Sequence, residues 1–175
     1  MRIQLAKCRE KPCLFEVVVD LAAQAVSYEE FAEPPRVLAA GRVEWRGGSK
    51  YAVVGSLRAD VSASCVRCLE AAPAVLERSF DLTFVPASSM PRHEPEVLDL
   101  DDAQGYDGSY EGEELELDPV IAEQFHLSIP MRFLCSADCP GLCPQCGARR
   151  GVEACDCREP AGDERLEVLR SLLER

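Results

Sequence analysis

Hydrophobic and polar residues alternate through the middle of the chain. In residues 56–65 the apolar side chains fall on odd positions with polar ones between them, and Tyr51 and Val53 belong to the same odd series. A period of two predicts a β-strand with one buried face. The Arg-Gly-Gly-Ser sequence at 46–49 separates this strand from the apolar residues Val43 and Trp45, which favours a hairpin. Because the alternation resumes in residues 76–84, we expect three consecutive antiparallel strands.

A helical period appears further along the chain. Apolar residues recur at i, i+4 and i+8, at Leu117, Ile121 and Phe125. Asp118 is suited to the N-cap, Pro119 to the first helical position, and Pro130 ends the pattern. We expect a second helix from about Asp163 to the C-terminus. Its apolar stripe is formed by Leu166, Leu169, Leu172 and Leu173.

The sequence is acidic in one place. Lys and Arg number 19 against 31 Asp and Glu, a net charge of −12, and residues 94–123 hold twelve acids with no Lys or Arg. Such a block is typical of a solvated loop, and the alternative is a segment that binds a basic partner. The acidic balance argues against binding nucleic acid through an overall positive field, so any such contact would be local.

These patterns predict an α+β fold, mainly an antiparallel β core with a long acidic loop, two helices and a cysteine-rich zinc-binding C-terminal module. We expect a β-rich core in residues 1–85, an acidic, mobile loop in 86–116, and a C-terminal unit in 117–175 that packs with the core as one body. No apolar run exceeds four residues, so we expect no membrane span and a cytoplasmic location.

The residues most suited to a chemical role are the cysteines, of which the chain has ten. Clustered cysteines without an export signal are more often metal ligands than disulfide partners. The first predicted zinc site uses Cys143, Cys146, Cys155 and Cys157, because Cys-Pro-Gln-Cys-Gly has the form of a zinc knuckle and Gly147 permits a positive φ. The remaining clustered cysteines, Cys65, Cys68, Cys135 and Cys139, form the second. Partner exchange between the two tetrads is the alternative arrangement.

Two cysteines stand apart from these tetrads. Cys8 and Cys13 have no evident partners among the clustered residues, and we expect them to be plain thiols.

Several arginines lie beside the proposed ligands and could touch phosphate as a small basic patch. They are Arg67, Arg132, Arg149, Arg150 and Arg158. A thiol–disulfide oxidoreductase is a further alternative, although Cys65-x2-Cys68 follows a strand in an antiparallel setting, where a thioredoxin-like motif begins a helix. The sequence has no phosphate loop, nucleophile elbow or catalytic zinc motif. We therefore expect a non-catalytic protein with no small-molecule substrate.

The ordered cysteine blocks resemble those of the bacterial YceD family, described as 23S rRNA accumulation proteins. The blocks are Cys-Val-Arg-Cys-Leu at 65–69, Ile-Pro-Met at 129–131, Cys135 to Cys139, Gly-Leu-Cys-Pro-Gln-Cys-Gly at 141–147, and Cys-Asp-Cys at 155–157. The resemblance covers about residues 40–175. It implies a factor that supports synthesis, processing or stability of 23S rRNA.

Two mechanisms stay open. In the first, the arginine patch binds rRNA or a pre-ribosomal particle, while the metal sites hold the geometry. In the second, the protein is an adaptor whose acidic segment 94–123 binds a basic ribosomal protein or processing factor.

Overall fold

A computed structural model describes residues 1–21, 31–90 and 105–157. Its main sheet has five strands in the order β2-β3-β4-β5-β6. Neighbouring strands are antiparallel except β5 and β6, which are parallel. The strands are β2 (Cys13–Asp20), β3 (Arg36–Gly47), β4 (Lys50–Ser64), β5 (Ala71–Pro86) and β6 (Gly108–Tyr110).

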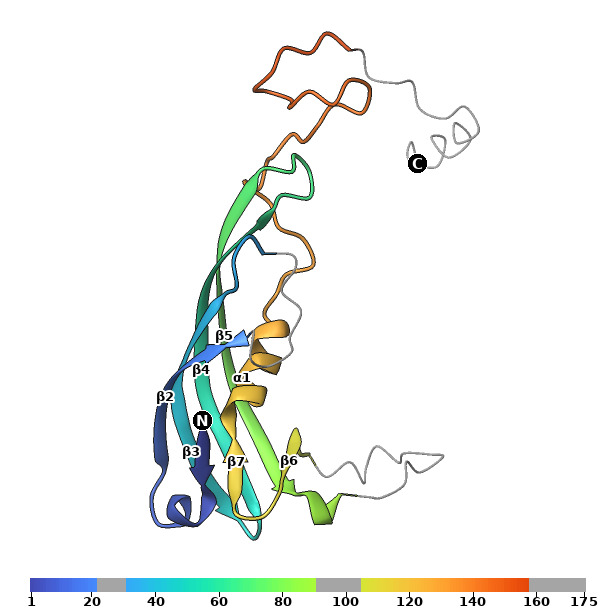
Figure 1. Cartoon of the computed structure of the whole chain (residues 1–175). Helices are drawn as coiled ribbons and strands as arrows, with labels where there is room; N and C mark the ends of the chain where they lie inside the picture. The colour runs from blue at the N-terminus through green and yellow to red at the C-terminus, as the bar shows by residue number, and fades with distance from the viewer. Residues whose placement is uncertain (22–30, 91–104, 158–175) are drawn as a thin grey trace, which may run out of the picture.

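The remaining elements pack around this sheet. A small antiparallel pair joins β1 (Arg2–Gln4) to β7 (Glu114–Glu116). Two 3-10 helices, η1 (Leu5–Arg9) and η3 (Ala87–Ser89), lie in connections, and α1 spans Leu117–His126. Figure 1 shows an elongated, curved sheet with α1 against one face, while residues 135–157 lie beyond the far end of the β4–β5 hairpin.

The predicted strand pattern is confirmed. The hairpin turn lies at residues 48–49, and odd positions of β4 pack into the core, as do even positions of β5. The side chains of Val37, Val43 and Val53 have no exposed surface. The sheet is nevertheless larger than three strands, because β2 and β6 extend it at its two edges.

Helix α1 covers the buried face of the sheet with Leu117, Ile121 and Phe125, all three fully buried. Phe125 and Phe133 both pack against Phe31, with ring centroids 6.0 and 5.8 Å from its own. This aromatic cluster fixes the chain that leaves the helix toward the cysteine-rich end. The apolar stripe of the predicted helix is therefore confirmed.

The helix boundaries differ from the prediction. Asp118 is not the N-cap, because the helix begins one residue earlier, at Leu117. The carboxylate of Asp118 instead lies 2.6 Å from the ammonium group of Met1. The helix ends at His126, four residues before Pro130, and Ser128 donates a hydrogen bond of 2.6 Å to the carbonyl of Phe125. Local hydrogen bonding thus ends the helix before proline is reached.

Two short strands, β6 and β7, lie inside the range 86–116 that the sequence predicts as a loop. Acidic side chains help to hold them there. The Asp107 carboxylate accepts the Thr83 backbone N–H at 2.7 Å, and Glu116 pairs with Arg2 at 2.5 Å. Residues 91–104 and the predicted second helix from Asp163 lie outside the described residues.

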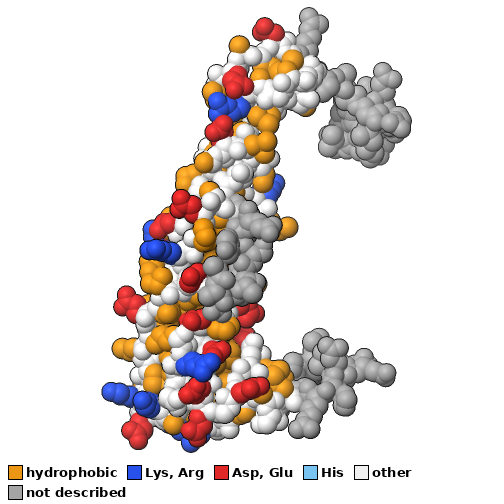
Figure 2. Space-filling model, viewed as in Figure 1, with side chains coloured by type: hydrophobic (Ala, Val, Ile, Leu, Met, Phe, Trp, Pro, Cys, Tyr) orange, Lys and Arg blue, Asp and Glu red, His pale blue; other side chains and the backbone are white. Residues whose placement is uncertain are grey.

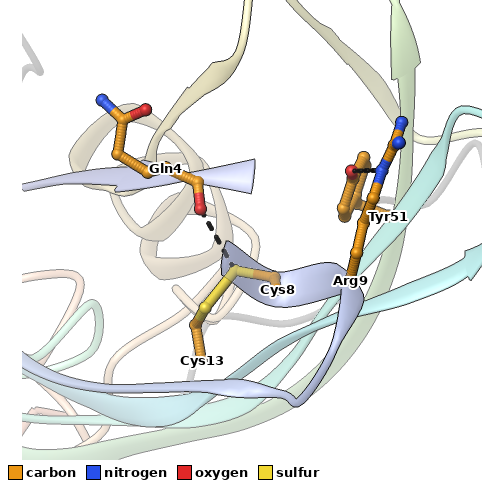
Figure 3. Close-up of a disulfide and its surroundings, with 5 residues drawn as sticks. All are labelled: Gln4, Cys8, Arg9, Cys13 and Tyr51. Carbon is orange, nitrogen blue, oxygen red and sulfur yellow. Dashed lines mark hydrogen bonds between the residues drawn. A yellow bond between two sulfur atoms is a disulfide. The ribbon is translucent and has the colours of Figure 1, made fainter. Parts of the chain in front are cut away.

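The prediction that Cys8 and Cys13 are plain thiols is wrong, because they form a disulfide. Helix η1 and the turn after it bring their Cα atoms to 5.2 Å, within the range that a disulfide spans. Figure 3 shows Cys8 beside the carbonyl of Gln4, and Arg9 donating to the Tyr51 hydroxyl at 3.0 Å. The bridge therefore ties η1 to the start of β2.

Candidate metal centres

The eight remaining cysteines form two clusters with the predicted partition. In each cluster the four sulfur atoms all lie within 4.8 Å of one another. One cluster, which we call the hairpin site, contains Cys65, Cys68, Cys135 and Cys139. The other, which we call the terminal site, contains Cys143, Cys146, Cys155 and Cys157. The alternative of partner exchange between the tetrads does not occur in the structure.

The hairpin site joins parts of the chain that are far apart in sequence. Cys65 directly follows β4, and its sulfur lies 3.8 Å from that of Cys139. The sulfurs of Cys68 and Cys135 lie 3.6 Å apart. Cys65 and Cys139 are buried. This cluster therefore fastens the segment after α1 to the end of the β4–β5 hairpin.

The terminal site is built within one short stretch and is more open to solvent. Cys143 is buried, whereas Cys146 and Cys157 are exposed. The sulfurs of Cys146 and Cys155 lie 3.6 Å apart. Because this segment has few apolar contacts of its own, its geometry depends on the thiols more than that of the hairpin site does.

The two Cys-x2-Cys turns share one hydrogen-bond pattern. In the hairpin site, Cys65 N–H donates to the Glu70 carbonyl at 2.8 Å, and Leu69 N–H to the Cys65 carbonyl at 2.9 Å. In the terminal site, Cys143 N–H donates to the Ala148 carbonyl at 2.8 Å, and Gly147 N–H to the Cys143 carbonyl at 2.9 Å. Leu69 and Gly147 both have positive φ, 64° and 76°. The predicted positive φ at Gly147 is thus confirmed, and the same knuckle recurs at residues 65–70.

In each site, backbone N–H groups lower the pKa of one thiol, so its sulfur carries negative charge more readily. The N–H of Cys135 lowers the pKa of Cys65 to about 6, and the N–H groups of Cys146 and Gln145 lower the pKa of Cys143 to about 6. Hydrogen bonding to a neighbouring thiol, from Cys139 and Cys146 respectively, raises the pKa of Cys135 and of Cys157 to about 12. Near neutral pH the four thiols of a site therefore deprotonate together only when a cation offsets their charge.

The donor set fits zinc. Four thiolates in a tetrahedron are the usual ligands of a structural zinc ion, with Zn–S near 2.3 Å, and they leave no open position for a substrate. Sulfur ligands exclude the hard cations calcium and magnesium, which take oxygen. The backbone N–H groups that face the Cys65 and Cys143 sulfurs supply the hydrogen bonding that commonly surrounds such ligands.

Residues between the two sites connect them. The Arg67 carbonyl accepts the Leu142 N–H at 3.0 Å, and its guanidinium donates to the Cys139 carbonyl at 2.8 Å. Gly141 has a φ of +75° and lies so close that a Cβ there would be 3.1 Å from the Arg67 carbonyl oxygen. The ion pair of Glu70 with Arg149, at 2.6 Å, adds a second link. These connections were not predicted, since nothing in the sequence pairs residue 70 with residue 149.

The predicted arginine patch is largely engaged within the protein. Arg67 contacts backbone carbonyls, and Arg149 pairs with Glu70 and Glu153. Arg132 is exposed, Arg150 is half-buried, and Arg158 lies outside the described residues. On the face shown in Figure 2, basic and acidic side chains alternate along the molecule instead of forming a basic surface.

Fold and site together define a cysteine-rich β-sheet protein with two four-thiol clusters of the structural zinc type. The chain belongs to the YceD family. The family model described as "Large ribosomal RNA subunit accumulation protein YceD" matches residues 53–173, more than half of the chain. The resemblance drawn from the cysteine blocks is therefore confirmed, and the family's description links it to accumulation of large-subunit ribosomal RNA.

Curated relatives come from mycobacteria. The chain is 32% identical over 103 residues to uncharacterized protein ML1660 of Mycobacterium leprae, covering 58% of this chain and 43% of the relative. It is 30% identical over 95 residues to uncharacterized protein Rv2926c of Mycobacterium tuberculosis, covering 54% and 42%. The chain thus spans less than half the length of these relatives. No solved structure matches it.

Within the described ranges, no helix has the length and apolar character needed to cross a bilayer.

Proposed function

We propose that this protein is a non-catalytic, cytoplasmic factor that supports the synthesis, processing or stability of 23S rRNA and holds two structural zinc ions. The observation that carries this proposal is the pair of assembled four-cysteine clusters in a chain of the YceD family. Four-thiolate zinc is coordinatively saturated, so its role here is to hold the two knuckles and the sheet together.

We favour an adaptor mechanism over direct binding of RNA. An adaptor touches a protein partner, and the engagement of Arg67 and Arg149 in internal contacts supports this choice. Asp107 and Glu116 of segment 94–123 are used internally as well, so the adaptor mechanism depends on other acids of that segment. The partner expected is a basic ribosomal protein or processing factor, with RNA binding through Arg132 as the competing mechanism.

Thiol–disulfide catalysis has weaker support. Cys65 follows an antiparallel strand instead of opening a helix, and its sulfur has three other cysteines as neighbours. A redox motif needs one reactive thiol and one resolving partner, whereas here four thiols lie together as mutual neighbours, the arrangement of a metal site.

Metal content tests the zinc assignment. Zinc per chain, measured by elemental analysis of protein purified without chelator, is expected to be two. Cys68→Ser and Cys146→Ser should each retain one, and the double variant none, because a single missing thiolate opens one tetrad only. A folded, metal-free wild-type protein contradicts the assignment.

The cellular role is tested by removing the gene from the source organism and measuring mature 23S rRNA relative to 16S rRNA. The ratio should fall, and wild-type protein should restore it. The Arg132→Glu variant should restore it equally well under the adaptor mechanism. Loss of rescue by that variant, together with RNA binding that weakens steeply with salt, would instead support direct RNA contact.

A further inference from the structure

Within the described part of the chain, the main sheet has two edges at which a further strand could pair. At one edge, β2 pairs with β3 along all of Cys13–Asp20 and with no other strand. Figure 1 shows β2 along this margin of the sheet. At the other edge, β5 is covered by β6 only at residues 84–86. An open edge carries unpaired backbone N–H and C=O groups that can bind another strand, so proteins usually protect it.

The sequence protects only one of these edges. The open part of β5 contains Pro73 and the charged residues Glu77, Arg78 and Asp81, which are residue types that discourage pairing. In contrast, β2 has no Pro, Lys or Arg, and no bulge interrupts its register with β3. We therefore expect a further strand to pair at β2.

Apolar side chains of β2 reach both faces of the sheet at this edge. Leu14 and Val18 lie on the face away from α1, where they are 80% and 58% exposed. Val17 lies on the face that carries the core and is only partly buried, whereas its neighbours Phe15 and Val19 on that face are buried. A strand added here would cover Val17 and Val18, and it would extend both the sheet and the core.

A second copy of β2 can pair with this edge about a twofold axis. When that axis is perpendicular to the sheet, opposite residues of the two antiparallel strands lie on the same face, so one residue sits on the axis. With Val17 on the axis, residues 14–20 of the two copies pair. Glu16 then faces Val18 of the second copy, and Asp20 faces its Leu14. Each acid of the strand thus faces an apolar side chain.

Other registers of this strand pair are less favourable. With Glu16 on the axis, that residue faces its own copy, and with Val18 on the axis, Glu16 faces Asp20 of the second copy. Like charges directly opposite each other destabilise a strand pair. An axis nearer an end of β2 pairs fewer residues, since an axis at Phe15 pairs only residues 13–17. Charge and length together therefore select the register centred on Val17.

We propose that β2 is a homodimer interface, at which two copies of the chain pair their β2 strands antiparallel with Val17 on the twofold axis. The two five-stranded sheets then form one continuous sheet. The partner is a second copy because the strand complements itself in charge and in apolar character, as an isologous interface requires. One strand pair is a small interface, so we expect dissociation at micromolar concentrations. The inference concerns assembly and does not depend on the proposed role in rRNA accumulation.

Sedimentation velocity of the full-length protein tests the assembly. Wild type should change from monomer to dimer as its concentration rises from about 1 to about 100 μM. A protein that stays monomeric at the highest concentration overturns the proposal.

Two substitutions of opposite charge at Val18 test the register. Val18→Glu places a carboxylate opposite Glu16 of the second copy, and this contact occurs twice in the dimer, so dimerisation should weaken about tenfold or more. Val18→Lys places an ammonium group there instead, and it should dimerise as tightly as wild type or more tightly. Both variants lose the same exposed valine. Equal weakening in both would indicate unspecific apolar association and would overturn the proposal.

A control at Leu38 distinguishes edge pairing from packing of the sheet faces. Leu38 is 52% exposed and lies directly beside Val18 in the register, one strand in from the edge. Its neighbour on β4 is Arg58, so the monomer should accept a carboxylate at this position. Leu38→Glu should dimerise within about twofold of wild type. If it weakens dimerisation as much as Val18→Glu does, the copies associate through their sheet faces and the proposal is wrong. Circular dichroism of each variant checks that the fold is unchanged.

Discussion

The two cysteine clusters are connected where Gly141 and Leu142 contact the backbone of Arg67, and we call this contact the joint. Gly141 has to approach the Arg67 carbonyl closely, so that the next residue, Leu142, can donate its N–H to that oxygen at 3.0 Å. Gly151 has a similar φ of +79°, yet a Cβ there would meet nothing closer than 3.8 Å. Both glycines have left-handed backbone, but only Gly141 lies close to other backbone atoms. A comparison of the two therefore distinguishes the effect of backbone strain from that of steric contact.

Gly141→Ala is expected to loosen the joint more than Gly151→Ala. Both variants carry the strain of a left-handed alanine, but only the first pushes a methyl group against the Arg67 backbone. Hydrogen exchange at the Leu142 amide should become at least about tenfold faster in Gly141→Ala than in Gly151→Ala. Equal exchange rates in the two variants would mean that close contact at Gly141 does not hold the joint.

At the scale of elements, the disulfide anchors η1 to the edge strand β2. Cys8 and Cys13 close a ring of a few residues. A chain-entropy treatment of so short a ring gives a stabilisation of about 2 kcal/mol. The cytosol keeps most thiols reduced, so this contribution depends on the redox conditions around the protein.

The double variant Cys8→Ala/Cys13→Ala should lose about 2 kcal/mol of unfolding free energy under non-reducing conditions. Denaturant unfolding of the zinc-loaded protein measures the difference. With reductant present, wild type and variant should unfold at nearly the same denaturant concentration. Alkylation of both cysteines in native, unreduced wild-type protein would contradict the bridge.

Periodicity and spacing predicted part of this structure well. The alternation in residues 51–65 and 76–84 identified β4 and β5, because one face of each is buried. The partition into two tetrads also followed, since Cys143, Cys146, Cys155 and Cys157 are close in sequence and leave four others.

Long-range and weakly patterned features were not predictable in this way. The strand β6 has only three residues, and the contact of Asp107 with Thr83 helps to hold it. No pattern in the neighbouring sequence predicts this contact. The Cys8–Cys13 bridge depends on a turn after η1 that places two Cα atoms at 5.2 Å. The leucine at the glycine position of the first knuckle is visible in the sequence only once the two knuckles are aligned by their cysteines.

At the scale of the whole molecule, apolar packing stabilises the sheet and α1, whereas the cysteine clusters organise the C-terminal end of the described chain. The sheet and α1 share one apolar core, which includes Val53, Leu117 and Phe125. Residues 135–157 contribute little to that core apart from Cys139. Folding of this end is therefore expected to depend on metal, whereas folding of the sheet is not.

Chelation should unfold one end of the protein only. Treatment with a strong zinc chelator under reducing conditions is expected to expose residues 135–157 to protease within minutes, while the β-sheet circular dichroism signal changes little. Added zinc should restore protection. Complete loss of the sheet signal on chelation would show that the metal sites support the whole fold.

The β4–β5 hairpin also determines how far the molecule reaches. β4 has 15 residues, and at about 3.3 Å per residue it extends about 50 Å. In Figure 1, α1 lies against the middle of the sheet, and the cysteine-rich end lies beyond the end of the β4–β5 hairpin. Because β4 runs unbroken along this length, any partner bound at the cysteine-rich end would be held apart from one bound where β3 and β4 meet in their hairpin.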